Sequence, residues 1–92
     1  MNKYLIEFFG TMLITFSIFF TSKWIITYKA IAIIISIAII VILGGAFNPA
    51  LVFAFYHAGK LDKSDVVPYI IAEILGGLAG FYVYKEFFNK AV

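Results

Sequence analysis

One pair of adjacent residues, Asn48 and Pro49, combines a polar side chain with a strong helix-starting signal. Asparagine is among the preferred N-cap residues, and proline is favoured at the first helical position. The start of a helix carries unpaired backbone N–H groups and a partial positive charge. Inside a membrane, this site could hydrogen-bond a passing solute through the Asn48 amide while disfavouring cations and protons. For the dipeptide alone, a surface turn between two interfacial segments is the favoured alternative.

The four residues before this pair, Gly44-Gly45-Ala46-Phe47, break an apolar run that would otherwise continue. Non-helical backbone at membrane depth is tolerated only where it is buried in protein or lines a water-filled cavity. We therefore expect this segment to expose backbone carbonyl oxygens to a solute pathway.

Two acidic residues, Glu7 and Glu73, lie within apolar segments. Glu7 belongs to the first turn of its predicted helix, where a carboxylate near the interface is favourable. Glu73 lies deeper, where a carboxylate is costly and should be paired, neutral or facing a cavity. A structural role for Glu73, bracing the segment before Asn48, is favoured over a proton relay.

The composition indicates an integral membrane protein. Of the 92 residues, 64% are hydrophobic and 13% are charged, which is too apolar for so small a soluble domain. The net charge is +2, the seven lysines are scattered and arginine is absent, so a nucleic-acid partner is not expected. The chain has no cysteine and one histidine, His57, and its serines and threonines lack a histidine–acid pattern. We therefore predict no metal site, no cofactor and no enzymatic activity.

Hydropathy predicts an all-α membrane protein with a single membrane domain over residues 1–92. Three transmembrane helices are expected at about 4–21, 25–43 and 66–84. The first is predicted to be a retained helix rather than a signal peptide, because two more apolar runs follow. Residues 44–58 are predicted to form a re-entrant loop and a half-helix, since the 11 residues from Asn48 to Ala58 would span only ~16 Å.

Turn and capping signals give the expected ends of these elements. Gly59 is a natural helix stop. Ser64 or Asp65 is predicted to cap the last helix, with Pro68 in its first turn, where the missing N–H costs little. Small residues let membrane helices approach closely, which predicts helix packing at Gly10, Gly76, Gly77 and Gly80.

Four motifs resemble, in order and at about the same spacing, those of the aquaporin (major intrinsic protein) family. Asn48-Pro49-Ala50 is similar to the signature tripeptide of that family, within a segment, 44–50, that resembles its Ser-Gly-Ala-His-x-Asn-Pro-Ala loop. Residues 7–11 resemble its opening Glu-x-x-Gly-Thr, residues 59–61 the turn after its first half-helix, and residues 69–77 its Tyr-x-x-Ala-Gln-x-x-Gly-Ala. The resemblance covers nearly the whole chain and the first half of a usual family member.

The resemblance implies a channel for water or small uncharged solutes such as glycerol. In this family two half-helices meet at the membrane centre, so Asn48 would be the pore asparagine of this chain. Gly44 and Gly45 would lie in the carbonyl-lined part of the pathway, and Glu7 would accept backbone N–H groups of the re-entrant loop.

The chain departs from the family pattern at three places. Its loop is one residue shorter and lacks the usual histidine, with Phe47 in the remaining space. Glu73 stands where glutamine is usual. Leu51 follows the tripeptide, and the arginine that follows the second tripeptide of the family has no counterpart.

One half-helix reaches only halfway across a bilayer, so a full pathway requires an inverted second half. Family orientation puts Lys3, Lys60 and Lys63 on one side and four lysines on the other, which gives no orientation bias. An antiparallel homodimer is one hypothesis, and a separately encoded or truncated half is at least as well supported; a higher homo-oligomer is also expected. The location is a plasma or inner membrane. Two alternatives remain, a non-conducting interaction protein and, ranked last, a proton-coupled transporter that uses Glu73.

Overall fold

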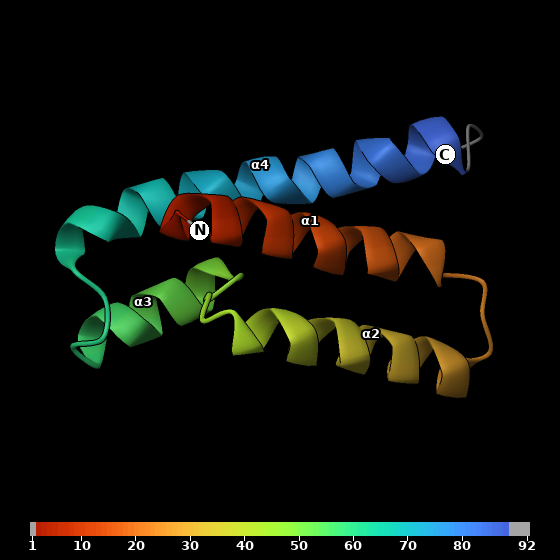
Figure 1. Cartoon of the computed structure of the whole chain (residues 1–92), viewed down its shortest axis with the longest axis horizontal. Coiled ribbons are helices and arrows are strands. Elements are labelled where there is room, and N and C mark those ends of the chain that lie inside the picture. The colour runs from red at the N-terminus through yellow and green to blue at the C-terminus, as the bar shows by residue number, and fades with distance from the viewer. Residues whose placement is uncertain (1, 89–92) are drawn as a thin grey trace.

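The computed structural model describes residues 2–88, and over that range every regular element is an α-helix. Lys90, one of the seven lysines, lies outside the described residues. The all-helical architecture agrees with the predicted fold class. The helices, labelled in Figure 1, are α1 (Lys3–Phe20), α2 (Ile26–Ile42), α3 (Pro49–His57) and α4 (Lys63–Phe87).

The two longest helices, α1 and α4, lie side by side along the long axis of the molecule (Figure 1). They have 18 and 25 residues and are long and apolar enough to cross a membrane by length and composition. Helix α2 is apolar but has 17 residues, and α3 has nine. The molecule is 40 Å long, close to the ~40–45 Å thickness of a bilayer with its headgroups.

Side-chain hydrogen bonds stabilise both ends of helix α1. The side-chain Oδ1 of Asn2 accepts the backbone N–H of Tyr4 at 2.7 Å and that of Leu5 at 3.4 Å. At the other end, the Thr21 hydroxyl donates to the Ser17 carbonyl oxygen at 2.7 Å. The Ser17 hydroxyl also lies 3.1 Å from that of Ser36, which ties α1 to α2 within the apolar part of the bundle.

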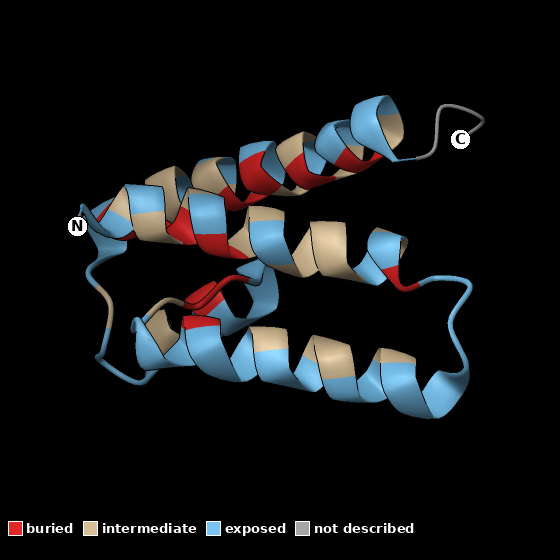
Figure 2. Cartoon of the chain, turned by 45° about the vertical axis from the view of Figure 1, so that its right-hand side comes forward, coloured by how far each residue is buried: buried red, intermediate tan, exposed pale blue. Residues whose placement is uncertain are grey.

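Close packing of α1 against α4 depends on two glycines. A Cβ atom at Gly76 would overlap the carbonyl oxygen of Phe8, and one at Gly80 would overlap that of Met12. Gly77 has more room, because its nearest neighbour, the Thr15 hydroxyl oxygen, would be 3.6 Å from an added Cβ. Figure 2 shows the buried residues of α4 gathered along the side that faces α1.

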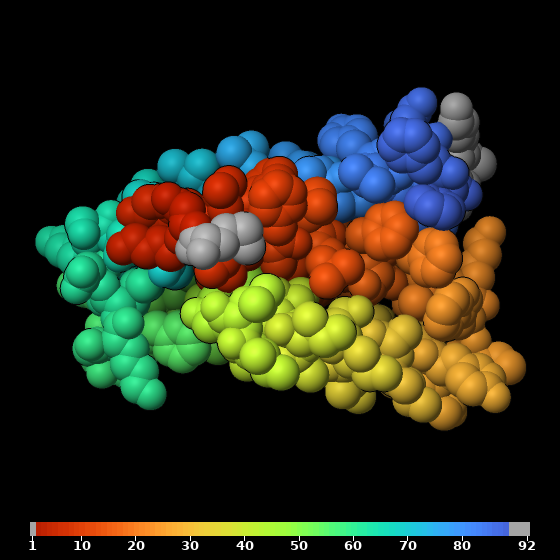
Figure 3. All heavy atoms as spheres, viewed as in Figure 1, coloured from red at the N-terminus to blue at the C-terminus, as the bar shows by residue number. Residues whose placement is uncertain are grey.

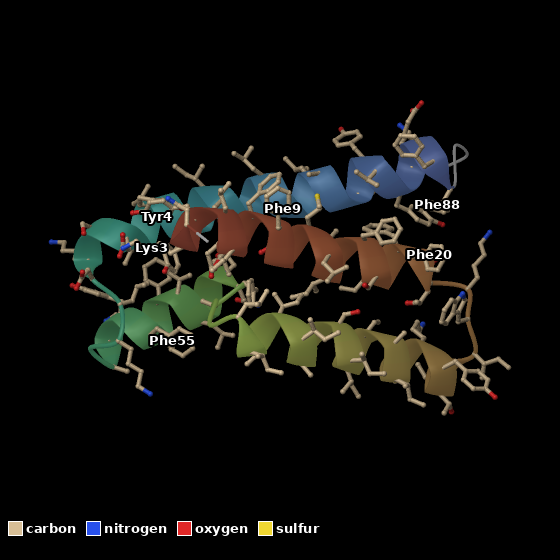
Figure 4. The ribbon with its side chains drawn as sticks, viewed as in Figure 1. Lys3, Tyr4, Phe9, Phe20, Phe55 and Phe88 are labelled. Carbon is tan, nitrogen blue, oxygen red and sulfur yellow. The ribbon has the colours of Figure 1, made fainter. Side chains whose placement is uncertain are left out.

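Aromatic rings extend this contact at the end of the bundle where α1 finishes. The rings of Phe20 and Phe88, both labelled in Figure 4, meet edge to face with centroids 5.4 Å apart. The Phe16 ring packs against both of them, with centroids 5.4 Å and 5.5 Å away. Such pairs add stabilisation beyond simple area burial.

At the opposite end, Asp65 joins α4 to α1 instead of capping its own helix. Its carboxylate accepts the Tyr4 hydroxyl at 2.6 Å and the Lys3 ammonium at 2.8 Å, from the first turn of α1 labelled in Figure 4. The predicted cap at Ser64 or Asp65 was therefore wrong.

Helix α4 starts earlier than the expected residue 66, at Lys63, because Asp62 adopts the extended N-cap conformation. Pro68 consequently lies beyond the first turn, where it removes one helical hydrogen bond.

The outer surface is strongly apolar. Ile26, Ile34 and Ile42 of α2 are 70%, 64% and 84% exposed, and many large side chains of α1 and α4 are also exposed. Figure 3 shows the side chains of α2 covering one long edge of the molecule, against those of α1. Such a large exposed apolar surface would be unfavourable in water but is favourable against the lipid of a bilayer.

Candidate functional site

A non-helical segment, residues 43–48, separates α2 from α3 and is called the break below. Helix α2 ends at Ile42 with Leu43 as its C-cap, and Gly44 follows with φ +89°, a left-handed conformation that glycine adopts without strain. Figure 1 shows α3 beginning about midway along the bundle and running toward the end where α1 begins. The half-helix therefore starts at mid-bundle, after a non-helical segment, and is not an unbroken extension of α2.

Glu7 of α1 holds the segment before α3 through two hydrogen bonds. Its Oε2 accepts the Ala46 N–H at 2.8 Å and its Oε1 accepts the Phe47 N–H at 2.9 Å. The Glu7 side chain is 1% exposed, so these bonds are shielded from solvent. Both carboxylate oxygens act as acceptors for backbone groups that have no helical partner.

Phe47 is a functional candidate that sequence reasoning treated only as a substitute for a histidine. It has φ +61°, uncommon for a non-glycine residue, and is 8% exposed. Its ring occupies the space beside Gly10 and Gly45, where an added Cβ atom would overlap it. In the sequence, Gly10 and Gly45 were the only signal of this packing. They indicate room for a large neighbouring side chain but do not show that the neighbour is Phe47.

Asn48 caps α3 with its side-chain oxygen. Oδ1 accepts the Ala50 N–H at 2.7 Å, and Pro49 follows at the first helical position. Among the described residues, the Asn48 side-chain nitrogen has no hydrogen-bond partner, and Asn48, Pro49 and Ala50 are all exposed. The residue therefore has a free N–H₂ donor on the open side of the break.

A cavity of ≈ 210 Å³ lies beside Asn48. Asn48 supplies its polar side chain, while α1, α2 and α3 supply the apolar walls through Ile14, Ile37, Val41 and Leu51. Phe47 and Ala46 complete the lining. A larger hollow of ≈ 430 Å³ lies elsewhere, between the first turns of α1 and the matching part of α4, and is almost wholly apolar. The one polar side chain in its lining, Tyr4, already donates its hydroxyl to Asp65, so the smaller cavity is the better candidate site.

The carbonyl groups of the break are also unpaired. Within residues 2–88, the carbonyl oxygens of Gly45, Ala46 and Phe47 accept no hydrogen bond, whereas the Asn48 carbonyl accepts the first helical bond from Val52. Unpaired carbonyls are tolerated in a membrane protein where they line a watery space. Gly44 is exposed at the end of α2, and only Gly45 approaches Glu7.

Glu73 of α4 lies behind the break and not in the cavity. Its side chain is 2% exposed and faces the Glu7 carboxyl and the Asn48 backbone N–H, but it forms no hydrogen bond with either. Between residues 2 and 88, no group of three or more potential metal ligands occurs. His57 lies at the far end of α3, where its Nδ1 contacts the Phe53 carbonyl oxygen at 2.8 Å.

The half-helix ends in a Schellman motif at Gly59. The Lys60 N–H donates to the Phe55 carbonyl at 2.9 Å, and the Gly59 N–H donates to the Tyr56 carbonyl at 3.1 Å. Gly59 has φ +77°, which this motif requires. The nine-residue helix is thus defined at both ends, by Asn48 and by Gly59.

The sequence model described as Major intrinsic protein matches residues 1–92, the entire chain. This chain belongs to the major intrinsic protein family. Its similarity to the glycerol uptake facilitator protein-like 6 of Lactiplantibacillus plantarum is 34% identity over 98 residues, covering 95% of this chain and 44% of that protein. No solved structure matches the chain significantly.

Shorter matches within the major intrinsic protein family point the same way. The chain is 44% identical over 36 residues to aquaporin Z of Brucella melitensis, covering 39% of this chain and 16% of that protein. It is 40% identical over 35 residues to aquaporin Z of Photorhabdus laumondii, covering 38% and 15%. The chain thus spans less than half the length of the curated relatives that it matches. Together with its apolar helices, membership of this family makes it an integral membrane protein.

Proposed function

We propose that this chain forms one half of a passive pathway for water or small uncharged solutes. Members of the major intrinsic protein family are membrane channels and not enzymes. The observation that carries the proposal is the position of Asn48, which caps a half-helix at mid-bundle and lines a cavity with a free N–H₂ group.

In the proposed topology, α1, α2 and α4 cross the membrane and α3 re-enters it from one side. The length of α1 corresponds to ~27 Å and that of α2 to ~25 Å, each close to the hydrocarbon thickness of ~30 Å. Helix α3 corresponds to only ~14 Å, so it begins near the centre of the bilayer and reaches only one of its faces. Gly44 permits the reversal that this topology requires.

A permeating molecule would exchange part of its hydration for groups at the break. The Asn48 N–H₂ would donate to an oxygen of the permeant, and the carbonyls of Gly45, Ala46 and Phe47 would accept from its hydroxyl groups. The apolar residues opposite offer no such bonds, so the permeant would pass in a single orientation. The partial positive charge at the start of α3 would disfavour cations.

The remaining half of the pathway would come from a second unit of the same fold in inverted orientation. An antiparallel copy of this chain would bring two Asn48 side chains together, and a separately encoded half would place a different asparagine there. Labelling both termini from each side of sealed vesicles distinguishes these arrangements, because an antiparallel dimer presents each terminus on both sides. If each terminus is labelled from one side of the vesicles only, the antiparallel self-copy is excluded.

Water and glycerol are the permeants to test, because the relatives named above are a glycerol uptake facilitator-like protein and two aquaporins. The rival is a non-conducting membrane protein that binds other membrane proteins. A proton-coupled transporter has less support, since Glu73 is not among the residues that line the cavity.

Stopped-flow light scattering on vesicles that contain the purified protein tests the proposal. Vesicles with the wild-type chain should shrink and re-swell faster than empty vesicles, and Asn48→Asp should change that rate. The matched control is Phe53→Leu, an exposed position on α3 that does not line the cavity. Equal rates for wild-type and empty vesicles would support the non-conducting alternative.

A further inference from the structure

The Glu73 carboxyl is a buried polar group that the proposed pathway does not use. Both of its oxygens are shielded, and neither has a hydrogen-bond partner. It faces the carboxyl of Glu7, which already accepts two backbone N–H groups, and the N–H of Asn48. Two carboxyl groups therefore share one side of the break that precedes α3.

Among residues 2–88, no cation neutralises this pair. On α1 the nearest ionisable side chains besides Glu7 are Lys3 and Tyr4, both bound to Asp65 of α4. On α4, Tyr69 lies one turn before Glu73 and contributes a neutral phenol. Residues 44–50 contain no ionisable side chain, and those of α2, Tyr28 and Lys29, lie in its first turn, at the opposite end of the helix from this segment.

Two adjacent buried carboxylates without a cation would repel each other and lose their hydration. A neutral carboxylic acid avoids both costs, because it has one O–H donor and keeps an acceptor oxygen. Glu7 uses both oxygens as acceptors, which is the bonding pattern of a carboxylate. Glu73 is therefore the member of the pair that can carry the proton.

We infer that Glu73 is a protonated positioning residue that donates an O–H hydrogen bond to Glu7 and accepts the Asn48 N–H through its other oxygen. The pair then carries one negative charge, which is shared by the backbone N–H groups of Ala46, Phe47 and Asn48. Removal of the proton places two negative charges together and releases the start of α3. The glutamine usual in this family at position 73 would donate an N–H in the same place without any dependence on pH.

The first test compares wild type with Glu73→Gln in sealed vesicles between about pH 6 and about pH 10, the range over which buried carboxylic acids ionise. Permeability of the wild type should be lost as the pH rises, and Glu73→Gln should match the wild type at low pH and stay constant. Asp62→Asn, which removes a charge at an exposed position, should retain the alkaline loss. A wild-type permeability that is constant over this range, or a Glu73→Gln variant that declines equally, would overturn the inference.

A second test does not require conduction, so it separates failure of this inference from failure of the proposed channel function. Infrared spectra of the wild type in lipid at neutral pH should contain the carbonyl band of a neutral carboxylic acid, and Glu73→Gln should lack it. The Tm in detergent should fall with rising pH for the wild type and stay level for Glu73→Gln. If the band is absent from the wild type and the two Tm profiles coincide, Glu73 does not hold the proton, whether or not the protein conducts.

Discussion

The Oε1 atom of Glu7 accepts the backbone N–H of Phe47 at 2.9 Å, although 40 residues separate them along the chain. With the neighbouring bond to the Ala46 N–H, this contact fixes the non-helical segment against α1. A buried N–H without a partner is costly, and lipid offers no replacement. The half-helix therefore depends on one side chain of another helix for its position.

Replacing Glu7 with alanine should destabilise the protein strongly. Two buried N–H groups would lose their acceptor at about 1–3 kcal/mol each, so the total loss should be about 2–6 kcal/mol. Glu7→Gln keeps one acceptor oxygen and should cost roughly half as much. Chemical denaturation in detergent micelles, followed by the fluorescence of Trp24, measures both variants. Equal stabilities for Glu7→Ala and Glu7→Gln would contradict the accepting role of this carboxylate.

Asn48 combines two functions that substitutions can separate. Asn48→Ala removes the oxygen that accepts the Ala50 N–H and should cost about 0.5–2 kcal/mol of stability. Asn48→Asp keeps that oxygen and should retain most of the stability, but it replaces the free N–H₂ donor with a negative charge. The aspartate variant should therefore fold normally and lose permeation of neutral solutes.

For Asn48→Ala and Asn48→Asp, a melting curve and a vesicle shrinkage rate are measured on the same preparation. Ser64→Ala is a suitable control, because Ser64 is exposed at the start of α4 and is remote from the cavity. An aspartate variant that conducts water and glycerol at the wild-type rate would rule out Asn48 as a permeant-binding residue.

Two glycines of α4 should respond differently to the same substitution to alanine. Gly80→Ala would push a methyl group into the Met12 carbonyl of α1 and should destabilise by about 1–3 kcal/mol. Gly77→Ala meets its nearest neighbour at 3.6 Å and should be neutral, or stabilising by up to about 1 kcal/mol through helix propensity. Thermal unfolding in detergent compares them directly. A larger loss for Gly77→Ala than for Gly80→Ala would mean that α1 and α4 pack differently from the structure.

The break before α3 could be predicted because its signals are local. Gly44 supplies a left-handed conformation, and Asn48 with Pro49 starts a helix whatever surrounds them. The close approach of α4 to α1 at Gly76 and Gly80 could also be predicted, since small residues four apart lie on one face of a helix.

The residues that could not be predicted act through contacts distant in sequence. Asp65 carries a capping signal, yet its carboxylate binds Tyr4, 61 residues away, because the crossing of α1 and α4 brings their first turns together. The helix then starts at Lys63 and leaves Pro68 in its interior. The ring of Phe47 is likewise placed by space beside Gly10, which only the packed structure defines.

Phe47 should set the width of the cavity beside Asn48, because its buried ring is part of the lining. Phe47→Ala should raise the permeability of glycerol relative to that of water, at a cost of about 3–5 kcal/mol in stability. Phe47→Leu removes less volume, so it should shift the ratio in the same direction while keeping the protein folded. Phe9→Ala is the matched control, since Phe9 is 46% exposed on α1 and does not line the cavity.

The two permeabilities are measured on one vesicle preparation per variant, so differences in the amount of inserted protein cancel in their ratio. A glycerol-to-water ratio that rises from wild type through Phe47→Leu to Phe47→Ala, and stays constant for Phe9→Ala, would assign the constriction to this ring. If Phe47→Leu folds and leaves the ratio unchanged, the narrowest point of the pathway lies elsewhere. It would then be formed by the apolar wall of Ile14, Ile37 and Leu51 or by the second half of the channel.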